Sequence, residues 1–163
     1  MTAVYEKLGM RFFYPDHWTL DESEALDGNS MLSVYSPHGA FWSVIVHPPG
    51  LEASDVADAA LEAMRQEYQE LDAEPFCDVI AGHEVLGSDL NFYCFDLTST
   101  AQIRALATTR GTYLLLCQAD DQEYEEVGAI FDAMTLSLLN PTMSAASFER
   151  SLKAVAAGEE ADR

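Results

Sequence analysis

The chain has 163 residues, of which 48% are hydrophobic and 22% are charged, as in a soluble single-domain protein rather than a disordered or disulfide-stapled one. Its 28 acidic and 8 basic residues give a net charge of −20. This charge argues against nucleic-acid binding, which needs Lys and Arg to neutralise phosphates, and against docking on an anionic membrane.

The sequence predicts a cytoplasmic protein without membrane insertion. Its first residues do not combine a basic stretch with an apolar one, as a signal peptide would. No apolar run approaches the roughly 20 residues of a membrane span. Cys94 and Cys117 lie in apolar, strand-like segments, where a thiol behaves as a small hydrophobic group. We therefore expect both to be buried and reduced, and we expect no disulfide.

The first half of the chain predicts three strands and a helix. Residues 10–14 form an aromatic strand that Pro15 ends, and residues 31–36 and 41–47 form two more. A hairpin turn is expected between the latter two, at residues 36–39, because Pro fixes φ and Gly tolerates a positive φ. Apolar residues then recur at helical spacing, which predicts a helix over residues 55–72.

The second half predicts an antiparallel meander followed by a helix. Its strand-like segments are residues 75–81, 90–97, 101–108 and 112–118. Turns are expected at Thr98-Ser99-Thr100 and at Arg110-Gly111, and such short connections indicate antiparallel neighbours. A second amphipathic helix is predicted over residues 122–138.

The predicted fold class is α+β, with an antiparallel sheet of about five to seven strands flanked by helices, an α/β/α sandwich if the helices cover opposite faces. Pro141 divides the chain into a domain of residues 1–140 and a C-terminal helical tail of residues 141–163. The tail places Phe148, Leu152 and Val155 on one helical face. A short lone helix is marginal in water, so we expect its own domain or a homodimer partner to bury that face.

The segment Phe12-Phe13-Tyr14-Pro15-Asp16-His17-Trp18 resembles the "F-x-hydrophobic-P-x-x-W" start of the Mog1/PsbP-like superfamily. The order of the predicted elements is similar over about residues 10 to 139. The resemblance implies an α/β/α sandwich and a binding or assembly role without a shared catalytic constellation. The superfamily includes Ran-binding Mog1 proteins, PsbP subunits of photosystem II and bacterial DcrB-like domains, and the DcrB-like branch is the most similar in size and compartment.

The sequence carries no phosphate-binding, dinucleotide-binding, nucleophile-elbow or zinc-protease motif, so we predict no cofactor and no metal. One alternative stays open. A small enzyme or metal-binding protein would use His17 and His47 with nearby carboxylates, although no spacing supports such a site.

The aromatic residues of the predicted strands leave two interpretations open, because alternation places them on both faces of the sheet. Helices cover both faces, or one face is partly open and holds an apolar peptide or helix. On the second interpretation, the residues that contact a partner are Trp18, Trp42, Tyr93, Phe148 and Leu152.

Acidic residues concentrate on the two predicted helices. Residues 51–74 carry eight acids and one base, and residues 120–140 carry six acids and no base. Such faces keep a protein soluble, or they dock a basic partner. The leading hypothesis is a non-enzymatic adaptor that holds a protein segment on an apolar surface, with the acidic helices steering a basic partner.

Overall fold

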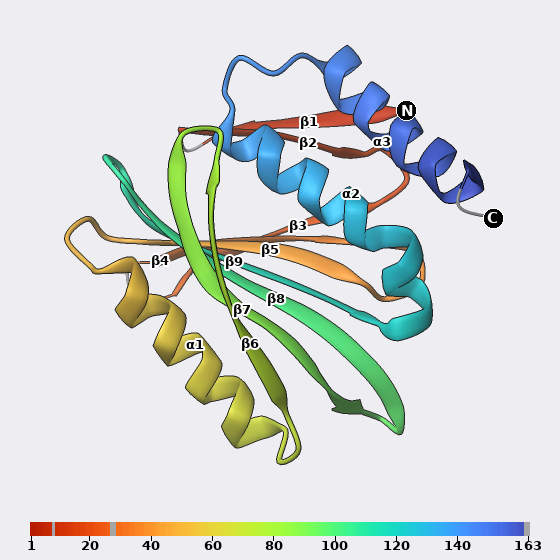
Figure 1. Ribbon diagram of the computed structural model, residues 1–163. Helices are drawn as coiled ribbons and strands as arrows, with labels where there is room; N and C mark the ends of the chain where they lie inside the picture. Colours follow the sequence, from red (N-terminus) through yellow and green to blue (C-terminus); the bar gives the residue numbers. More distant parts are fainter. Residues whose placement is uncertain (8, 27–28, 162–163) are drawn as a thin grey trace.

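A computed structural model describes residues 1–7, 9–26 and 29–161 of the chain (Figure 1). Nine strands and three helices follow one another along these residues. In chain order they are β1 (Thr2–Lys7), β2 (Met10–Pro15), β3 (Thr19–Leu26), β4 (Asn29–Tyr35), β5 (Phe41–His47), α1 (Ala53–Glu67), β6 (Asp72–Ile80), β7 (His83–Cys94), β8 (Leu97–Thr108), β9 (Gly111–Asp120), α2 (Asp121–Leu139) and α3 (Ala145–Ala161).

The prediction of an α+β fold with an antiparallel sheet is confirmed. Strands β3 to β9 form one sheet of seven strands in the order β3-β4-β5-β9-β8-β7-β6, and β1 and β2 form a separate pair. The turn between β7 and β8 is Phe95-Asp96, where both residues have positive φ as in a type I′ hairpin. The predicted turn at Thr98-Ser99-Thr100 is wrong, because these β-compatible residues lie inside β8.

Helix α1 covers one face of the sheet, over β7, β8 and β9. Val56 and Ala57 are its buried residues, and they join an apolar cluster with Leu90, Phe92 and other sheet residues. The helix ends at Glu67 rather than at residue 72, because Tyr68 already has an extended backbone.

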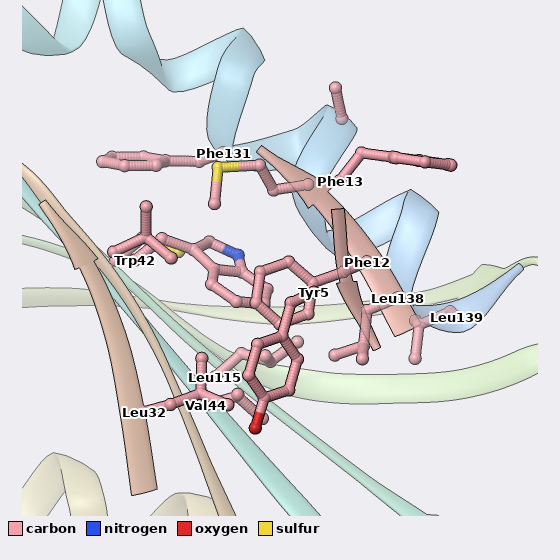
Figure 2. Packing of buried hydrophobic residues seen from close by; sticks show 14 of the residues in the cluster. Tyr5, Phe12, Phe13, Leu32, Trp42, Val44, Leu115, Phe131, Leu138 and Leu139 are labelled. Atoms are coloured by element: carbon pink, nitrogen blue, oxygen red, sulfur yellow. The ribbon is translucent and has the colours of Figure 1, made fainter. Parts of the chain in front are cut away.

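Helix α2, the β1–β2 pair and the start of α3 cover the opposite face, as Figure 1 shows. Figure 2 shows the core between these layers, where sheet side chains such as Trp42 face the ring of Phe12 and the α2 residue Phe131. All three rings are fully buried. Helices on opposite faces of the sheet make the arrangement an α/β/α sandwich, with the two-stranded pair added to the α2 layer.

The C-terminal segment packs against the domain that precedes it. Phe148 is fully buried with its ring centre 5.8 Å from that of Phe13, and Leu152 packs partly buried against the same cluster. Arg11 ties the connection between α2 and α3, since its Nη1 donates to the carbonyl oxygens of Pro141 and Met143. The chain's own domain therefore buries the face of Phe148 and Leu152; the division into 1–140 and 141–163 stays a prediction. The side chain of Val155 lies outside the described residues.

The three cysteines are unpaired and differ in exposure. Cys117 is buried, and burial raises the pKa of its thiol. Cys94 is only partly buried, in contact with the hydroxyl of Tyr68, and Cys77 is exposed on β6. Within the described residues, the helices all fall short of the length and apolarity that crossing a membrane requires.

Candidate functional site

A groove of about 600 Å³ lies between α2 and the β6–β8 end of the sheet, and we call it the α2 groove. Figure 1 shows the β6–β7 hairpin curving up to the level of α2. Eleven residues from four elements line it: Phe76, Asp78 and Ile80 from β6, Asp89 from β7, Thr100, Gln102 and Arg104 from β8, and Tyr124, Asp132, Thr135 and Leu136 from α2.

Three residues that lie opposite one another on β6, β7 and β8, a row across the sheet, form the floor of the α2 groove. Phe76 lies opposite Gly87, and Gly87 lies opposite Arg104. Because Gly87 has no side chain, the Arg104 side chain extends along the row until its guanidinium carbon lies 3.5 Å from the centre of the Phe76 ring. A Cβ on Gly87 would lie 1.8 Å from the carbonyl oxygen of Ile103. The close approach of β7 and β8 at this row therefore requires glycine.

Arg104 is buried and its hydrogen bonds are made within the sheet. Its Nη1 donates to the carbonyl oxygens of Ile103 at 3.0 Å and Ser88 at 3.3 Å. Its Nη2 donates to Oδ1 of Asp89 at 2.6 Å, which forms an ion pair at the floor of the α2 groove. Since Asp89 is 45% exposed and Arg104 only 7%, the pair presents its carboxylate rather than its guanidinium to solvent.

A second polar group connects the sheet to α2 across the α2 groove. Gln102 is buried on β8, and its Nε2 donates to the hydroxyl of Tyr124 and to Oδ1 of Asp132. Removal of water from around the Asp132 carboxyl raises its pKa, although Gln102 and Arg104 partly oppose the shift. Burial likewise raises the pKa of the Tyr124 hydroxyl.

The charges and the apolar walls together define what the α2 groove can bind. Carboxylates of Asp78, Asp89 and Asp132 line it against the single guanidinium of Arg104. Phe76, Ile80 and Leu136 supply apolar surface beside them, and the described lining contains no histidine or cysteine. The arrangement therefore suits a ligand that carries a hydrogen-bond donor or a positive charge on an apolar stem.

The structure places most of the predicted partner-binding residues in the core. Trp18 is 5% exposed, and Trp42 and Phe148 are fully buried, so they offer no surface to a partner. Leu152 is partly buried against the same core, and Tyr93, at 61% exposed, is the one of the five that faces solvent. The interpretation that helices cover both faces accounts for this burial.

Strand alternation does not identify the layer that covers an aromatic face, which is why the sequence left two interpretations of these side chains open. Trp42 donates from Nε1 to Oγ1 of Thr135 on α2, a contact that no local pattern predicts. One local signal does point to the α2 groove. Gln102 and Arg104 alternate with apolar residues in the predicted strand of residues 101–108, so the two polar side chains share one face.

The alternative site at His17 and His47 gains no support from the structure. His17 is exposed, with Nδ1 4.0 Å from a carboxylate oxygen of Asp16. His47 ends β5, and its buried Nε2 has no hydrogen-bond partner among the described residues. No group of three or more potential metal ligands is assembled anywhere in the described part of the chain.

Comparisons with known proteins identify the fold. No family model and no curated protein matches the chain. The cyanobacterial PsbP of Synechocystis sp. PCC 6803 has a similar structure, with a TM-score of 0.58 and 17% identity over 83% of this chain and 90% of that one. The protein PA94 of Pseudomonas aeruginosa, of unknown function, has a TM-score of 0.53 and 11% identity over 84% of this chain and 95% of that one.

Proposed function

We propose that this chain, which has the Mog1/PsbP-like fold, is a non-enzymatic adaptor that holds a segment of a protein partner in the α2 groove. The observation that carries the proposal is the lining of that groove, where apolar walls stand beside three carboxylates and one internally paired arginine. Such a site complements a segment that carries both apolar and basic side chains.

The charge of the helices supports the same kind of partner. Residues 51–74 and 120–140 hold 14 of the 28 acidic residues and one of the 8 basic ones. A field of one sign attracts a basic partner before contact and accelerates association. In this proposal the helices steer the partner, and the α2 groove holds it.

Site-specific photo-crosslinking in the source cell tests this function. A benzoylphenylalanine in place of Leu136 lines the α2 groove, and the same group in place of Leu51 is the matched control, exposed before α1. We expect an adduct at position 136 whose crosslinked segment carries Lys or Arg among apolar residues. A synthetic peptide of that segment should compete for it.

Two results would contradict the proposal: adducts at position 136 no more abundant than at position 51, or a crosslinked segment that is acidic. A cytoplasmic location and a homodimer stay predictions, to be checked by cell fractionation and by sedimentation of the purified protein.

A further inference from the structure

We infer that Asp132 is the acceptor for a cationic side chain of the partner, an ammonium or guanidinium group that enters the α2 groove. This inference deepens the proposed function, since it names the recognition group within the same groove and the chemical class that it selects.

The arginine at the floor does not make the α2 groove an anion site. Both terminal nitrogens of Arg104 donate to sheet carbonyls or to Asp89, and its guanidinium lies over the Phe76 ring. An anion would have to displace these contacts and would also face the carboxylates of Asp78, Asp89 and Asp132. Charge complementarity therefore favours a cation.

Asp132 has the acceptor capacity that such a cation needs. A carboxylate offers about four lone-pair sites. In the described structure Asp132 accepts one long hydrogen bond, from Nε2 of Gln102 at 3.4 Å. Asp132 is exposed where it lines the α2 groove, so a ligand can reach it, and partial desolvation raises the pKa of its carboxyl. A positively charged hydrogen-bond donor of the ligand would pair with the remaining lone-pair sites of the Asp132 carboxylate.

The walls next to Asp132 fit the rest of a basic side chain. Lys and Arg bury their methylene stems along apolar surface while the charged end finds a polar partner. Ile80 and Leu136 offer apolar surface in the same groove, whose volume of about 600 Å³ accommodates such a side chain. The groove thus matches both parts of a basic side chain.

A pair of small probes tests this without knowledge of the partner. n-Hexylammonium carries a cation on an apolar stem, and n-hexanol carries the same stem without the charge. Binding to the full chain is followed by NMR through the side-chain amide signals of Gln102, which contacts Asp132. We expect n-hexylammonium to shift these signals saturably and n-hexanol to bind at least tenfold more weakly.

Charge-matched variants show whether Asp132 is the acceptor. Asp132→Asn removes the carboxylate and keeps the shape, and it should weaken n-hexylammonium binding at least tenfold. Asp58→Asn makes the same charge change on the exposed surface of α1 and should leave binding within twofold. Equal affinity of wild type and Asp132→Asn, or equal affinity of the two probes, would overturn the inference.

The crosslinking experiment separates this inference from the proposed function. If Asp132→Asn weakens the adduct at position 136 as well as probe binding, the cation comes from the protein partner, as inferred. If the adduct forms undiminished in Asp132→Asn, the adaptor function survives and the role of Asp132 in recognising the partner is refuted.

Discussion

Replacing Phe148 with alanine tests whether α3 is a structural part of the domain. Phe148 is fully buried in the cluster that contains Trp42 and Phe131, and its ring centre lies 5.8 Å from that of Phe13. Removing a buried phenylalanine side chain costs about 3–5 kcal/mol. Each kcal/mol lowers the Tm of a domain of this size by about 2–4 °C, so we expect Phe148→Ala to lower the Tm by roughly 6–20 °C.

Thermal and urea unfolding followed by circular dichroism measure this loss. Arg150→Ala is the matched control on the same helix, since Arg150 is exposed and donates to the hydroxyl of Ser147. We expect the control to change stability by at most about 0.5 kcal/mol. Truncation after Asn140 should destabilise the protein at least as much as Phe148→Ala. If both altered chains keep the Tm and the apparent mass of wild type, the packing described for α3 does not hold in solution.

Four further changes have defined outcomes. Gly87→Ala should destabilise the fold by more than the typical ~1 kcal/mol, because its Cβ would lie 1.8 Å from a carbonyl oxygen of β8; an unchanged urea midpoint would disprove the close approach. Glu123→Ala should cost about 1–3 kcal/mol, since Oε1 accepts from Ser36 at 2.6 Å and from the Ala40 amide at 3.1 Å; a neutral effect would show that the 36–40 turn does not need this acceptor. The pKa of Asp132 is raised above the ordinary value of 3.8, so the fold disfavours the ionised carboxyl and stability falls as pH rises from that value through the folded pKa; Asp132→Asn should be more stable than wild type at pH 7 and equal to it near pH 3, and a less stable variant at pH 7 would contradict the shift. Association with the crosslinked partner should slow between about 0.1 and 1 M salt, as the Debye length falls from about 10 to 3 Å; a rate independent of salt would leave the acidic faces only a solubilising role.

The sequence predicted the elements whose residues carry a strong local pattern. The helical spacing of apolar residues around Met64 and Met134 located α1 and α2, and the apolar run that ends near Cys117 located the buried strand β9. It missed β1 and β3, because polar and charged residues interrupt the apolar pattern of Thr2–Lys7 and Thr19–Leu26. β3 is an edge strand of the seven-stranded sheet and β1 belongs to the two-stranded pair, so each has one partner strand and one edge on which polar residues are tolerated.

The candidate site could not be predicted from the sequence for a different reason. The α2 groove depends on the row that aligns Phe76, Gly87 and Arg104, and this register is set by the whole meander rather than by any one segment. Local patterns showed only that Gln102 and Arg104 share a strand face. Without the position of α2, the sequence did not show that Asp132 meets that face.

In the proposed function, acidic residues attract the partner before contact and Asp132 holds it after contact, and salt affects these two interactions differently. Charges on the exposed faces of the helices act through water and are screened within about 10 Å at 0.1 M ionic strength. Asp132 lines the α2 groove, where a bound cation would contact its carboxylate directly, and a contact pair in a groove is screened less than charges separated by water. Salt should therefore reduce the association rate more than it reduces the lifetime of the complex, whereas Asp132→Asn should shorten the lifetime and leave most of the salt dependence of association in place. Measuring both rate constants for the crosslinked segment at two salt concentrations, in wild type and Asp132→Asn, decides the matter. If Asp132→Asn lowers the association rate and leaves the lifetime of the complex unchanged, Asp132 contributes to the long-range attraction and does not hold the bound partner.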